Sequence, residues 1–123
     1  MWVISKYGFA SAVEHRDQPG WVLVRARDRA DLEEFCGVAR DKGLSGFSES
    51  EIEENPQADY RFRMTVKSED WAELVKVLAG EIDYPNFKNE VATVDPERAA
   101  IYGGVWSELR RIQESDSDWV PED

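Results

Sequence analysis

Two segments of this chain alternate polar and apolar residues with the two-residue period of a β-strand, and each runs directly into an amphipathic helical pattern. The first is WVLVRAR at residues 21–27, and the second is YRFRMTVK at residues 60–67. Alternation of this kind places every second side chain on the same face of a sheet. We therefore expect a sheet with one apolar face, which the following helices cover.

Helix-start signals follow both segments and recur later in the chain. Asp28 can cap a helix that continues to the helix-stopping Gly43, and Ser68 can cap a second helix. Asn86 can cap a short third helix, and Asp95, which precedes a proline, can cap the last one. The sequence thus predicts helices directly after each clear strand and two more near its C-terminal end.

The order of these elements predicts an α+β fold, in which an antiparallel sheet has its helices packed on one face. We expect residues 2–15 to form two short strands or one strand bent at a glycine, and residues 45–59 to contain a short strand and a turn. A ferredoxin-like core fits residues 21–80, with the N-terminal hairpin extending the sheet. We expect a single domain over residues 1–113 and an acidic mobile tail at residues 114–123.

Composition excludes several classes of protein. The chain has 123 residues with one histidine and one cysteine, Cys36, so an internal disulfide or a zinc site is excluded. It contains no apolar run of membrane-spanning length and no signal-peptide pattern, which predicts a cytoplasmic protein without a membrane role. No glycine-rich phosphate loop or catalytic signature occurs, so we expect no cofactor and favour a protein that is not an enzyme.

The charge of the chain also bears on its partners. The formal net charge is −11, and about −6 remains when the acidic tail at residues 114–123 is set aside. A net negative charge disfavours generic binding to nucleic acid, because lysine and arginine contacts to phosphates supply most of that affinity.

Arginines nevertheless occur at alternate positions of both strand segments. If the two strands are neighbours, the apolar residues of both segments, among them Val24, Met64 and Tyr60, pack under the helices. The arginines then form one basic stripe on the opposite face. The candidate binding stripe consists of Arg25, Arg27, Arg61 and Arg63, together with Trp21.

Several interpretations of this stripe remain open. The first is a face that is solvated or paired with the chain's own carboxylates. The second is a surface for a partner protein, and the third is a platform for RNA, single-stranded DNA or a nucleotide. For function we expect a protein-interaction domain, with binding of nucleic acid or a nucleotide as the alternative. An acidic DNA mimic that inhibits a host protein is a further hypothesis, while the oligomeric state is not indicated.

Two other groups of residues are secondary candidates. His15 beside Asp17 resembles a general base oriented by a carboxylate, but no nucleophile is marked nearby, so a structural hydrogen bond is the favoured interpretation. The segment IDYPNFK at residues 82–88 breaks a helical pattern. It is either a structural joint or an exposed recognition corner formed by Asp83, Asn86 and Lys88.

Five segments together resemble a family of small uncharacterised bacterial and phage proteins: GFASAVEHRD, LVRARDRADLE, ADYRFRMTV, IDYPNFKNEV and YGGVWSELRRIQ. The resemblance spans most of residues 1–113, and the IDYPNFK joint together with the VW..L..IQ spacing is its most specific part. It implies a single compact intracellular domain and no particular activity, cofactor or site residue.

Overall fold

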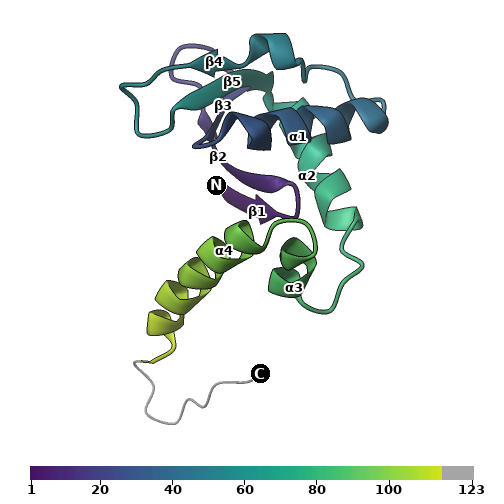
Figure 1. Ribbon diagram of the computed structural model, residues 1–123. Helices are drawn as coiled ribbons and strands as arrows, with labels where there is room; N and C mark the ends of the chain where they lie inside the picture. Colours follow the sequence, from purple (N-terminus) through teal and green to yellow (C-terminus); the bar gives the residue numbers. More distant parts are fainter. Residues whose placement is uncertain (115–123) are drawn as a thin grey trace. The chain divides into compact units, whose positions relative to one another are not determined.

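A computed structural model describes residues 1–114 of the chain (Figure 1). The chain divides into two compact units, Met1–Ile82 and Asp83–Asp123, and each is described by itself. The single domain expected over residues 1–113 stays a prediction, and residues 115–123 of the predicted tail lie outside the described residues. Within residues 1–114, no helix is long and apolar enough to cross a membrane.

The first unit is built on a five-stranded antiparallel sheet with the strand order β1-β2-β3-β5-β4. The N-terminal segment forms two strands joined by a tight turn, which is the first of the two predicted alternatives, and the acidic segment before residue 60 contributes only a two-residue strand. The strands are β1 (Trp2–Ser5), β2 (Gly8–Glu14), β3 (Trp21–Ala26), β4 (Glu53–Glu54) and β5 (Phe62–Lys67).

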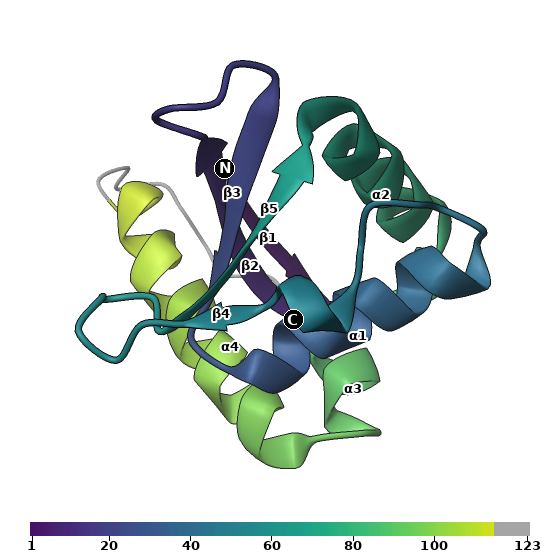
Figure 2. The same cartoon turned by 90° about the horizontal axis from the view of Figure 1, so that it is seen from above.

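Two helices cover one face of this sheet, α1 (Arg29–Asp41) and α2 (Ser68–Gly80), with a 3₁₀ turn, η1 (Glu49–Glu51), between them in the chain. Figure 2 shows both helices on the same side of the strands, which confirms the predicted α+β architecture. Asp28 caps α1, because its carboxylate accepts a hydrogen bond from the backbone N–H of Ala30 at 3.0 Å. The predicted cap at Ser68 is wrong: the helix begins at that residue, and Lys67 precedes it without a side-chain cap.

The topology explains where the N-terminal hairpin fits. The elements β3, α1, β4, β5 and α2 follow the order of the first five elements of a ferredoxin-like fold, with β5 antiparallel between β3 and β4. In that fold a strand after the second helix pairs with the outer side of the first strand. Here β2, which precedes β3 in the chain, occupies that position.

The core of the first unit lies between the sheet and its two helices. Val24 and Met64 are cross-strand partners that are only 1% and 2% exposed, so the predicted helix-facing side is confirmed for them. Burial of such side chains is the main stabilising contribution to a fold of this size. The remaining buried apolar residues are mainly Ala10, Ala12, Ala26 and Val66 of the strands, Leu32, Phe35, Cys36 and Ala39 of α1, and Trp71, Leu74 and Leu78 of α2.

One close contact joins the start of β2 to α1. Gly8 has a φ of +142°, and a Cβ atom at this position would lie 2.5 Å from Cγ of Asp31. The Asp31 carboxylate is buried there and accepts a hydrogen bond from the backbone N–H of Phe9 at 2.9 Å. The absence of a side chain at Gly8 therefore lets a carboxylate of the helix reach the strand backbone.

The second unit contains α3 (Phe87–Ala92), α4 (Pro96–Leu109) and a 3₁₀ turn, η2 (Arg110–Ile112). The capping roles predicted for Asn86 and Asp95 are confirmed. Phe87 of α3 stacks on Tyr102 of α4 with a centroid separation of 5.8 Å. The α4 residues Ile101 and Leu109 are each 58% exposed, because the six-residue α3 covers only one side of α4.

Candidate functional site

The face of the sheet opposite α1 and α2 carries the predicted arginines and is called the arginine face below. Arg25 of β3 is the direct cross-strand partner of Arg63 on β5 and of Ser11 on β2. Trp2 and Glu53 continue the same row towards the two edges of the sheet. The pairing of β3 with β5 therefore confirms the adjacency on which the predicted stripe depended.

Arg25 and Arg63 are half-buried and have no carboxylate partner within residues 1–114. One terminal nitrogen of Arg25 donates to the Ser11 hydroxyl at 2.8 Å, and one of Arg63 donates to the backbone carbonyl of Tyr60 at 3.1 Å. The Nε atoms of both arginines are buried, and neither has a hydrogen-bond acceptor in the described part of the chain. Like charges placed directly opposite each other in a sheet are destabilising, so this pair lowers the stability of the sheet.

Tyr60 lies on the arginine face and not under the helices, which corrects the prediction for this residue. The guanidinium carbons of Arg25 and Arg27 lie 4.6 and 4.5 Å from the centroid of its ring. Its ring also stacks on Phe9, at a centroid separation of 6.3 Å. The alternation of β5 does not extend to Tyr60, because the strand begins only at Phe62. Two cation–π contacts therefore fix Tyr60 against the arginines.

Arg61 differs from the other arginines of the predicted stripe. Its Nε lies 2.5 Å from a carboxylate oxygen of Glu54 on β4, and both side chains are about half exposed, at 56% and 44%. Arg61 is therefore paired with one of the chain's own carboxylates, as the first interpretation of the stripe expects. Arg27, by contrast, donates to the backbone carbonyl of Asp59 at 2.9 Å and forms no ion pair with any described residue.

Apolar side chains surround the arginine pair. Trp2 and Val13 are 68% and 38% exposed, and Trp2 meets Phe9 edge-on at a centroid separation of 5.8 Å. Leu23 is the cross-strand partner of Val13 and shares this face. Trp2, Phe9 and Val13 were not predicted to belong to this face, although Phe9 and Val13 alternate with small residues along β2, a pattern that indicates a shared face.

Trp21 lies at the far end of the same face, where Lys67 is its cross-strand partner. The Lys67 ammonium lies 5.8 Å from the centroid of the indole ring. The face therefore combines aromatic and aliphatic side chains with arginines, a composition typical of the centres of protein interfaces.

Carboxylates border the arginine face. Glu53 on β4 is the cross-strand partner of Arg63 on β5 and shares the arginine face. Glu54 and Asp59 are exposed near the β4 edge. The negative charge of these groups limits the extent of the positive region. It would therefore repel an extended polyanion that runs past the arginines.

The secondary candidates have structural contacts. His15 accepts a hydrogen bond at Nδ1 from the backbone N–H of Asp17 at 3.1 Å, which fits the favoured interpretation. In the second unit, Asn86 accepts from the backbone N–H of Asn89 at 3.0 Å, and the Lys88 ammonium lies 4.6 Å from the ring centroid of Trp106. Asp83 is exposed.

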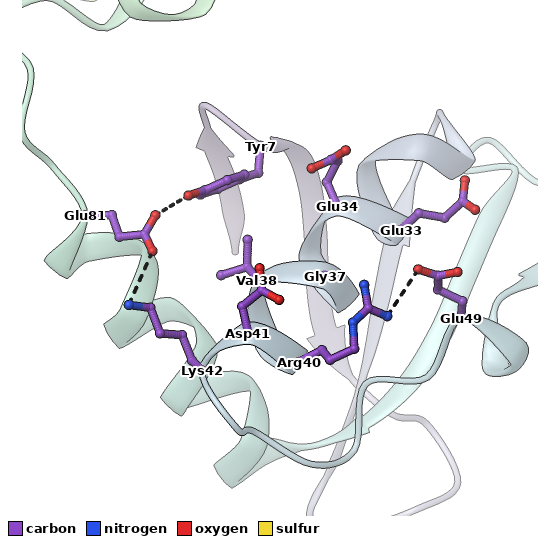
Figure 3. A pocket seen from close by; sticks show the side chains of 10 residues that line it. All are labelled: Tyr7, Glu33, Glu34, Gly37, Val38, Arg40, Asp41, Lys42, Glu49 and Glu81. Carbon is purple, nitrogen blue, oxygen red and sulfur yellow. Dashed lines mark hydrogen bonds and ion pairs between the residues drawn. The ribbon is translucent and has the colours of Figure 1, made fainter.

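A hollow of about 580 Å³ beside α1 has an acidic lining (Figure 3). Glu49 pairs with Arg40 at 3.8 Å, and Glu81 pairs with Lys42 at 4.0 Å and accepts a hydrogen bond from the Tyr7 hydroxyl. Internal pairs thus neutralise part of its charge. Among residues 1–114, no three His, Cys, Asp or Glu side chains are arranged to hold a metal ion.

Cys36 belongs to the core and not to a site. Its side chain is 1% exposed, and its sulfur lies 3.9 Å from that of Met64. Burial, together with the negative charge of Glu49, raises the pKa of the thiol to about 11. The thiol is therefore protonated at neutral pH and unreactive, since the thiolate is the nucleophilic form.

Comparison of this chain with protein-family models, with curated proteins and with solved structures gave no match. The arginine face is therefore the feature of this chain that bears most directly on its function.

Proposed function

We propose that this protein is a non-enzymatic interaction domain that binds a partner protein through its arginine face. The observation that carries the proposal is the half-buried arginine pair Arg25–Arg63, which has no carboxylate partner among residues 1–114 and is set among exposed apolar side chains. Arginine and large aromatic residues dominate the binding energy of protein interfaces, where they lie in desolvated centres.

The surroundings of the pair favour a protein over a nucleic acid. The ring of Tyr60 is buried between its neighbours and is 6% exposed, so a base cannot stack on it. Trp2, at 68% exposure, is the one strongly exposed ring on the arginine face as described. A single exposed ring, a short row of cations and an acidic border do not suit a strand of phosphates, which needs several stacking rings and a continuous positive groove.

A site-specific photo-crosslink tests this proposal with the full chain in an extract of the cells that make it. p-Benzoylphenylalanine replaces Val13 on the arginine face in one variant and Glu73 on the exposed side of α2 in the matched control. We expect the first variant alone to give a protease-sensitive adduct of one discrete mass, and Arg25→Ala in the same chain to remove it. A nuclease-sensitive adduct at position 13 would support nucleic-acid binding instead, and equal labelling at both positions would refute a specific surface.

A further inference from the structure

We infer that Arg25 and Arg63 form a slot for one carboxylate, so that the partner presents an Asp or Glu side chain flanked by apolar residues. This inference rests on the proposed function, because it specifies the chemistry of the same partner.

The arginine pair is incomplete within the described part of the chain. Two positive side chains are direct cross-strand neighbours in a half-buried face, and the Nε–H group of each is buried without an acceptor. Buried donors in proteins nearly always have an acceptor. A carboxylate between the two guanidinium groups accepts hydrogen bonds from the second terminal nitrogen of each, which no described residue engages, and offsets the mutual repulsion of the pair.

The spacing and the shape of the slot fit a carboxylate. Neighbouring strands lie about 4.8 Å apart, so opposite side chains on one face can approach the same small group. A guanidinium group is a planar fork of N–H donors that matches the two oxygens of a carboxylate. Ser11 and the backbone carbonyl of Tyr60 already hold one terminal nitrogen of each arginine, which limits the motion of both side chains.

The charges around the slot favour a carboxylate over a phosphate. A phosphate monoester carries a charge of about −1.5 to −2 at neutral pH, whereas a carboxylate carries −1. Glu53 lies directly across from Arg63, so its negative charge repels a phosphate more strongly than a carboxylate. The apolar residues Trp2, Val13 and Leu23 on the same face can contact apolar side chains on either side of an acidic residue.

Arg61 provides an internal control. It lies two positions before Arg63 in the chain, but its guanidinium is already paired with Glu54 at 2.5 Å. An external carboxylate should therefore bind at Arg63 and not at Arg61.

The experiment follows the Nε–Hε NMR signals of the arginines in the ¹⁵N-labelled full chain. One probe is the peptide acetyl-Ser-Leu-Glu-Val-Ser-amide, and its matched control has Gln in place of Glu. We expect the Glu peptide to shift the signals of Arg25 and Arg63, and the Gln peptide to bind at least about tenfold more weakly, because it lacks the charge-assisted hydrogen bonds. Arg63→Met should abolish the response, whereas Arg61→Met should keep it.

Equal responses to the two peptides would overturn the inference, and so would an unchanged response in Arg63→Met. A stronger response to oligothymidine at equal concentration would also overturn it, in favour of a phosphate site. If the amide spectrum shows that Arg63→Met is unfolded, Arg63→Lys replaces it. Lysine keeps the charge but lacks the planar guanidinium fork, so an unchanged affinity of Arg63→Lys for the Glu peptide counts against the slot. A protein adduct at position 13 without any response to the Glu peptide refutes the carboxylate slot and keeps the proposed function. A response to the Glu peptide without a protein adduct refutes the partner protein and keeps the carboxylate slot.

Discussion

An arginine kept for binding is expected to lower the stability of the sheet that carries it, and Arg63→Met tests this directly. The substitution removes a like-charge contact with Arg25, worth about 0.2–1 kcal/mol, and a buried N–H group without an acceptor, whose desolvation costs about 1–3 kcal/mol. Against this, it loses the hydrogen bond to the Tyr60 carbonyl, worth about 0.5–1.5 kcal/mol. Methionine keeps the apolar stem, so we expect a net gain of about 1 kcal/mol in the free energy of unfolding.

The assay is urea unfolding followed by tryptophan fluorescence, in a buffer of low ionic strength. A gain of this size corresponds to a rise in Tm of about 5 °C for a unit of this length. Arg61→Met is the matched control and should be neutral or destabilising by at most about 1 kcal/mol, because it removes an exposed ion pair. A loss of more than 1 kcal/mol in Arg63→Met would refute the reasoning, since it would show that Arg63 supports the sheet.

Three further predictions concern the fold. Gly8→Ala should destabilise the protein by about 3 kcal/mol in urea unfolding, because the φ of +142° and the contact with Asp31 exclude a side chain there; a loss below 1 kcal/mol would contradict this contact. The raised pKa of Cys36, about 11, means that the unfolded chain releases the thiol proton first, so the contribution of this thiol to the free energy of unfolding should be constant below pH 9 and fall between pH 9 and 11; Cys36→Ala should lessen the fall in stability over that range. Asp95→Ala should lower the free energy of unfolding by about 1 kcal/mol and reduce the helical circular-dichroism signal, because α4 loses its cap; an unchanged signal would contradict this role.

The sequence predicts the layers of the first unit well, because alternation and helix caps are local signals. Val24 and Met64 lie on the expected face, and Asp28 caps the expected helix. Errors occur where a strand ends: Tyr60 lies outside β5, so its side chain does not follow the alternation, and Ser68 is the first helical residue instead of the cap.

Whether each arginine forms an ion pair with a carboxylate could not be predicted, because this depends on which distant strands lie side by side in the sheet. Glu54 reaches Arg61 only because β4 pairs with the first residues of β5. The sequence offered many carboxylates and no means of deciding which arginine each would meet. Strand register selected Arg61 for pairing and left Arg25 and Arg63 facing each other.

The two edges of the sheet differ in their capacity to accept another strand. β1 presents an apolar segment that includes Trp2 and Ile4, whereas β4 is a two-residue strand made only of Glu53 and Glu54. Short, charged edges resist pairing with other chains. Growth of a fibre by repeated strand addition requires two receptive edges on each molecule, and the short acidic β4 edge is not one. Strand addition at the β1 edge alone would therefore stop at two copies, because β4 blocks further growth of an ordered aggregate.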